Sequence, residues 1–111
     1  MQLIQEHEEN FTTIKVENSR LDASIAPDFK RQMEDIIEHN KHHIILDISS
    51  VSFMDSSSLG AMVALLKSIK KHGELVISGA SGTVLDLFQL TRMDSVFTLT
   101  KDVSDAQNEL H

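Results

Sequence analysis

An apolar run at residues 43–48, followed by a serine-rich turn and a helix pattern, constrains the fold more than any other feature. The run, His43-Ile44-Ile45-Leu46-Asp47-Ile48, is nearly continuous, which is typical of a parallel strand covered on both faces. Beyond the turn, apolar residues recur at helical spacing at Leu59, Met62, Val63, Leu66 and Ile69. The turn between them ends in Asp55-Ser56-Ser57-Ser58. Three hydroxyls and a carboxylate therefore stand where a helix begins.

The same alternation of strand and helix continues along the chain. We expect strands at residues 2–6, 11–16, 44–48, 75–78 and 96–99, and helices at about 26–38, 57–71, 83–90 and from Asp102 onward. This order predicts an α/β fold, a mostly parallel four- to five-stranded sheet with about four helices packed on it. At 111 residues, we expect a single domain spanning residues 1–111. The loops at 18–24, 49–58 and 79–83 should meet at the carboxyl edge of the sheet.

Composition excludes several classes of function. The formal net charge of −7 argues against binding to nucleic acid or to an anionic membrane. Without cysteine there is no disulfide and no thiolate metal site. The first residues lack the basic and apolar regions of a signal peptide, and no apolar run approaches the roughly 20 residues of a membrane span. We expect a cytoplasmic protein without metal or cofactor, and nothing demands more than a monomer.

The serine cluster offers more than a helix cap requires. Ser and Asp are favoured caps, and capping alone could explain them. However, the helix that follows carries a face of small residues, Gly60, Ala61 and Ala64, although glycine in a helix costs about 1 kcal/mol relative to alanine. Small residues let another backbone approach closely, which predicts a docking surface. A phosphoryl group would add about −1.5 to −2 charge there, could be held by the helix amides and dipole, and would expel a partner.

Residues 47–60, Asp-Ile-Ser-Ser-Val-Ser-Phe-Met-Asp-Ser-Ser-Ser-Leu-Gly, closely resemble the signature of STAS domains of the bacterial anti-sigma-factor antagonist type. Residues 20–24, 75–80, 84–88 and 93–97 follow the same family pattern, so the resemblance covers nearly the whole chain and implies the STAS fold. It also implies partner switching. The unphosphorylated domain binds a GHKL-type serine kinase, often an anti-sigma factor, which phosphorylates the serine directly after the aspartate. A 2C-type serine phosphatase restores binding, and the domain itself is not an enzyme.

Carried onto this chain, the resemblance makes Ser56 the phosphorylation site and Asp22 an acidic residue lining its pocket. The candidate partner-binding residues are Asp22, Ser24, Asp55, Ser57, Ser58, Gly60, Ala61 and Ala64. Two positions depart from the family pattern. Ser19-Arg20 stands where glycine and an acidic residue are usual, and Ser58 stands where glycine is frequent. An arginine at position 20 can pair with a phosphate or with an acidic group of a partner.

Other interpretations compete with a phosphorylation switch. A serine hydrolase needs a base beside the serine. However, His42 and His43 begin the strand that ends at the serine loop, and there is no Gly-x-Ser-x-Gly turn. The histidines within residues 39–43 could suggest a metal site, but their spacing favours a polar connection. A binding module independent of phosphorylation, and a switch with a non-sigma output such as biofilm or exopolysaccharide production, remain alternatives.

Overall fold

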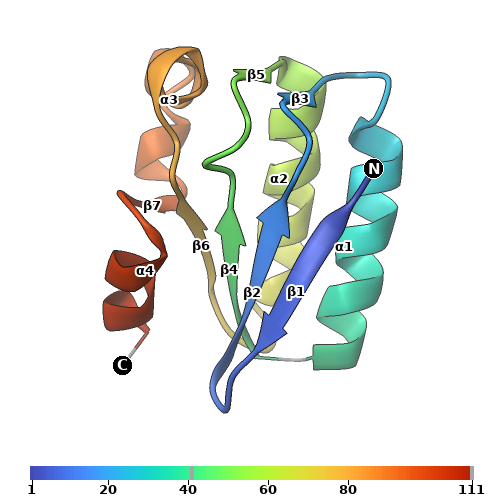
Figure 1. Cartoon of the computed structure of the whole chain (residues 1–111), viewed down its shortest axis with the longest axis vertical. Coiled ribbons are helices and arrows are strands. Elements are labelled where there is room, and N and C mark those ends of the chain that lie inside the picture. Colours follow the sequence, from blue (N-terminus) through green and yellow to red (C-terminus); the bar gives the residue numbers. More distant parts are fainter. Residues whose placement is uncertain (41, 111) are drawn as a thin grey trace.

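The apolar run forms the central strand of a five-stranded sheet. The computed structural model describes residues 1–40 and 42–110. Its main sheet contains β1 (Leu3–His7), β2 (Phe11–Val16), β4 (His43–Asp47), β6 (Leu75–Ser78) and β7 (Thr98–Thr100), in the order β1-β2-β4-β6-β7. Neighbouring strands from β2 to β7 run parallel, and only β1 is antiparallel to its neighbour. The predicted mostly parallel sheet is therefore confirmed (Figure 1).

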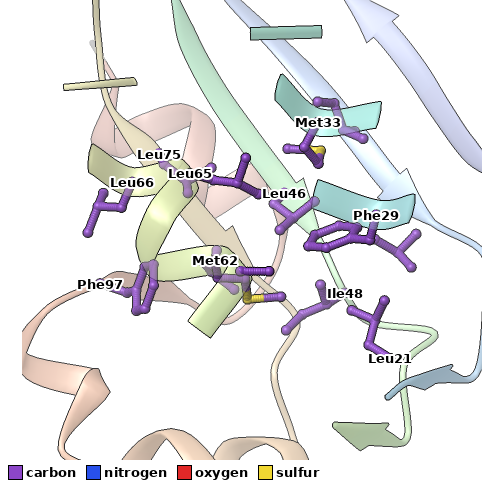
Figure 2. Packing of buried hydrophobic residues seen from close by; sticks show 14 of the residues in the cluster. Leu21, Phe29, Met33, Leu46, Ile48, Met62, Leu65, Leu66, Leu75 and Phe97 are labelled. Atoms are coloured by element: carbon purple, nitrogen blue, oxygen red, sulfur yellow. The ribbon is translucent and has the colours of Figure 1, made fainter. Parts of the chain in front are cut away.

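Helices cover both faces of this sheet. α1 (Ala26–Asn40) and α2 (Ser56–Ile69) pack side by side on one face, and α4 (Val103–Glu109) packs on the other, against β4, β6 and β7. Within β4, Ile44 and Leu46 belong to the core under α1 and α2, whereas Ile45 faces the cluster around Ala106 of α4. Figure 2 shows Phe29 and Met33 of α1 and Met62 and Leu65 of α2 closing over Leu46. Burial on both faces explains the continuous apolar run.

The predicted helices are present with small shifts at their ends. α1 buries the expected face, Phe29, Met33, Ile36 and Ile37. α2 begins at Ser56, one residue earlier than predicted, because Asp55 is its N-cap. α3 (Gly82–Leu90) is followed by the short 3₁₀ helix η1 (Met93–Ser95). Residue 41 lies outside the described residues, so the polar connection predicted at 39–43 is described only on either side of it.

Two local predictions were wrong. Residues 96–97, assigned to the last strand, belong to the turn after η1, because the N–H groups of Val96 and Phe97 both donate to the Met93 carbonyl. Phe97 instead packs its ring edge-on against Phe88, with 5.7 Å between centroids. Within the predicted loops 18–24 and 49–58, Arg20–Leu21 forms β3, which pairs in parallel with β5 (Phe53–Met54). These two-residue strands come from long-range pairing and carry little periodicity of their own.

The second, small sheet joins the loops at the carboxyl edge of the main sheet, as Figure 1 shows above β2 and β4. The Ser19 carbonyl accepts hydrogen bonds from the N–H groups of Ser52 and Phe53, at 2.8 and 3.2 Å. The Thr83 hydroxyl at the start of α3 donates to the Ser52 carbonyl at 2.9 Å. The three loops predicted to meet at this edge therefore do meet, and α2 begins among them.

Candidate functional site

The start of α2 is organised by the Asp55 carboxylate. Its Oδ1 accepts the N–H groups of Ser57 and Ser58 at 3.1 and 3.2 Å, while the Asp55 carbonyl accepts the N–H of Leu59 at 3.2 Å. The Asp55 carboxylate thus satisfies two of the donors that a helix start leaves free, while its carbonyl accepts the first hydrogen bond within the helix. The sequence predicted that the helix amides could hold a phosphate; in the structure the Asp55 carboxylate already accepts two of them, those of Ser57 and Ser58.

Asp55 also fastens the loop between β3 and α1 to this turn. Its Oδ2 accepts the N–H of Ala23 at 2.8 Å, and its own N–H donates to the Leu21 carbonyl at 3.3 Å. One side chain therefore caps α2 and sets the distance between α2 and the approach to α1. Removing this carboxylate would loosen both the start of α2 and the loop between β3 and α1.

The three serines of the turn have different surroundings. Ser56 and Ser57 are exposed, whereas Ser58 is completely buried. The Ser58 hydroxyl donates to the Leu21 carbonyl at 2.6 Å. The prediction that Ser58 contacts a partner is therefore wrong, because its side chain lies beneath the surface and links α2 to β3. Ser56 and Ser57 are the hydroxyls of this turn that face solvent.

A hollow of about 460 Å³ lies between the beginnings of α1 and α2, and we call it the α1–α2 hollow. Four predicted residues line it: Ser57, Gly60, Ala61 and Ala64. The opposite wall was not predicted and consists of Ala23, Ala26, Pro27 and Lys30. The only sequence signal for it was the small, Pro-containing start of the first helix. Because its residues are small, the hollow is wide enough for a side chain of another protein.

Asp22 and Ser24 form the rim beside this turn. The N–H and hydroxyl of Ser24 both donate to Asp22 Oδ1, and Arg20 Nε lies 3.4 Å from Asp22 Oδ2. These hydrogen bonds, that of the Ser24 hydroxyl foremost, lower the pKa of the Asp22 carboxyl below its ordinary value. Asp22 is therefore anionic at neutral pH, as the prediction of an acidic residue beside the serine requires.

Arg20 and Phe53 add a feature that sequence reasoning did not find. They are paired in register across β3 and β5, and the Arg20 guanidinium lies 4.2 Å from the centre of the Phe53 ring. Both side chains are exposed to solvent, Arg20 at 59% and Phe53 at 37%. A guanidinium over an aromatic face is a favourable arrangement, and here it forms part of the surface next to the turn.

The geometry offers little for catalysis or metal binding. His43 begins β4, at the end of that strand away from the serine turn. The Nε2 atom of His42 lies 2.7 Å from the hydroxyl of the buried Thr12. Within residues 1–40 and 42–110, no three His, Asp or Glu side chains lie close enough together to hold a metal ion. None of the helices in those ranges has the length and apolar character needed to cross a membrane.

Comparison with known proteins gives consistent matches. The family model described as STAS domain matches residues 3–106. The anti-sigma-B factor antagonist of Listeria monocytogenes is 34% identical over 91 residues, which cover 79% of this chain and 77% of that protein.

Two solved structures share the fold. An anti-sigma factor antagonist from Mycobacterium paratuberculosis matches with a TM-score of 0.89 at 18% identity, over 98% of this chain and 92% of that one. The Bacillus cell fate determinant SpoIIAA, solved in its phosphorylated form, matches with a TM-score of 0.69 at 17% identity, over 99% of this chain and 100% of that one.

Proposed function

The chain belongs to the STAS domain family, and on this premise we propose that it is a partner-switching protein of the anti-sigma-factor antagonist type, controlled by phosphorylation of Ser56. It acts as a ligand and as a kinase substrate and catalyses nothing itself. Its partners are a GHKL-type serine kinase with anti-sigma activity and a 2C-type serine phosphatase. Both act on it in the cytoplasm.

The observation that carries this proposal is the position of Ser56. It is the first residue of α2, it is exposed, and its hydroxyl has no hydrogen-bond partner among the described residues. Its neighbours hold the structure instead, because Asp55 caps the helix and the Ser58 hydroxyl is bonded to Leu21. Ser56 is thus a free nucleophile on a rigid support, and its modification leaves the supporting hydrogen bonds intact.

The surface beside Ser56 explains why phosphorylation would release a partner. The α1–α2 hollow, next to Ser57, is lined mainly by small apolar side chains, so we expect a kinase side chain to enter it. The Asp55 carboxylate caps this turn, and Asp22 lies in the neighbouring loop between β3 and α1, which Asp55 holds through the Ala23 N–H. A phosphoryl group carrying about −1.5 to −2 charges would add to this negative charge and would place a hydrated group within the contact. The docked kinase would then dissociate.

Phosphosite mass spectrometry on the protein from its native cells tests the proposal directly. We expect a species heavier by one phosphoryl group, about 80 Da, that maps to Ser56 and is absent from Ser56→Ala. Ser57→Ala is the matched control, since Ser57 is also exposed, and it should keep the modification. Absence of phosphate from Ser56 under every growth condition would refute the switch and favour a binding module independent of phosphorylation.

Binding measurements test the consequence of the modification. A kinase recovered with the unaltered chain should bind Ser56→Ala with unchanged affinity and bind Ser56→Asp at least tenfold more weakly. Both variants should fold, because Ser56 makes no supporting side-chain contact in the described structure. Equal affinity for the two variants would show that charge at this position does not control docking.

A further inference from the structure

A phosphoryl group on Ser56 would find two of the donors of the helix start already taken by the Asp55 carboxylate. The N–H groups of Ser57 and Ser58 are held by Asp55 Oδ1, and that of Leu59 by the Asp55 carbonyl. To reach these donors the phosphate would have to displace a carboxylate that also binds the Ala23 N–H at 2.8 Å. A cationic side chain would supply counter-charge without that displacement.

Two cations lie near this turn in the described part of the chain. Lys30, on α1, lines the α1–α2 hollow together with Ser57 and lies 4.0 Å from Glu34. Arg20, on β3, is closer to the turn through the backbone. The carbonyl of the next residue, Leu21, accepts hydrogen bonds from the Asp55 N–H at 3.3 Å and the Ser58 hydroxyl at 2.6 Å. These bonds fix the backbone at Arg20 beside the residues that flank Ser56.

Arg20 is held loosely enough to change partners. Its contact with Asp22 is 3.4 Å long and its side chain is 59% exposed. Asp22 Oδ1 keeps two hydrogen bonds, from the N–H and the hydroxyl of Ser24, when Arg20 moves away. A planar guanidinium can bind two phosphate oxygens at once, whereas a lysine ammonium acts as a point charge.

We infer that Arg20 senses the modification: when Ser56 carries a phosphoryl group, the Arg20 guanidinium leaves Asp22 and the Phe53 ring and pairs with the phosphate oxygens. The inference rests on the proposed phosphorylation of Ser56. Its consequence is a second change in the docking surface. The cation is withdrawn from the rim, and the face of Phe53 that it covered becomes exposed. A phosphatase could recognise this altered surface, and the kinase would lose it.

The chain alone provides the test, with phosphoserine incorporated at position 56 during translation. Phosphorus NMR follows the second ionisation of the phosphate, which is normally near pH 6. Pairing with Arg20 favours the dianion, so the midpoint should lie about 0.2–0.7 pH unit lower in the unaltered chain than in Arg20→Gln. Arg20→Lys should fall between them, and Lys30→Gln should match the unaltered chain. The Phe53 ring signals should shift on phosphorylation only where Arg20 is present.

Equal midpoints for the unaltered chain and Arg20→Gln would overturn the inference. So would a midpoint that moves in Lys30→Gln alone, since the phosphate would then be paired across the α1–α2 hollow. Because phosphoserine is introduced directly, these results do not depend on a cellular kinase. Failure to find phosphate on the native protein would refute the proposed function without changing this measurement.

Discussion

Gly60 should lower the stability of α2 while keeping the α1–α2 hollow open to a partner. It lies inside α2, on the wall of the α1–α2 hollow, and a Cβ added there would meet nothing within 4 Å. Its backbone has no positive φ. Replacing it with alanine therefore brings neither a clash nor backbone strain. What remains is the difference in helix propensity between the two residues, about 0.5–1 kcal/mol in favour of alanine.

We expect Gly60→Ala to raise the free energy of unfolding by that amount. For a chain of this length the midpoint of thermal unfolding should rise by about 2–4 °C, and the urea midpoint by about 0.3–0.5 M. Calorimetry and urea titration followed by circular dichroism measure both. If docking uses the hollow, the same variant should bind the partner more weakly, because the new methyl group fills space that the partner needs.

Gly73→Ala is the matched control, because the chemical change is the same and the surroundings differ. A Cβ at position 73 would lie 2.8 Å from the backbone carbon of His42 and 2.9 Å from the nitrogen of His43. Two backbone segments would have to separate, at a cost of about 1–3 kcal/mol. We therefore expect Gly60→Ala to raise the free energy of unfolding and Gly73→Ala to lower it. A Gly60→Ala variant no more stable than the unaltered chain would refute the reasoning about α2.

Two further predictions concern stability. Ser58→Ala should lower the free energy of unfolding by about 1 kcal/mol in urea titration, because the Leu21 carbonyl loses a buried 2.6 Å hydrogen bond; Ser57→Ala should change it little, and equal effects would contradict the division of roles between the two serines. The pKa of His42 is lowered, first by burial and then by the nearby His43 and His7. The folded state therefore binds the proton less readily than the unfolded chain, so this contribution to stability is complete above about pH 6.5 and is lost as the pH falls through the folded-state pKa. Urea midpoints at pH 7.5 and 5.5 should differ less for His42→Gln than for the unaltered chain, and an equal difference would refute the assignment.

The sequence was a good guide to the layers of the fold. The run from Ile44 to Leu46 indicated a strand buried on both faces, and the spacing of Phe29, Met33 and Ile36 indicated the inner face of α1. Both signals arise from burial, which selects apolar side chains at a fixed period. Pairing over long distances leaves no such period. β3 and β5 contain two residues each. They are strands because Arg20 pairs with Phe53 across the chain, and no pattern within either short segment indicates a strand.

The candidate site was predictable only in part for the same reason. Ser57, Gly60 and Ala64 could be placed on one helix face from their spacing. The wall that faces them, from Ala23 to Lys30, requires knowledge of how α1 packs against α2. The buried position of Ser58 was also hidden, since a serine at a helix start is usually exposed or capping. Here the neighbouring Asp55 takes the capping role and leaves the Ser58 hydroxyl free to bond Leu21.

This division of labour explains how one turn can be both a structural junction and a switch. Modification of Asp55 or Ser58 would break hydrogen bonds that hold α2 to β3, so it would partly unfold the protein. Ser56 makes no such bond in the described structure, and the groups beside it are already satisfied by one another. Charge added at Ser56 therefore acts on what the surface can bind. A switch of this kind needs no change of fold, because the rigid frame that supports the serine is built from its neighbours.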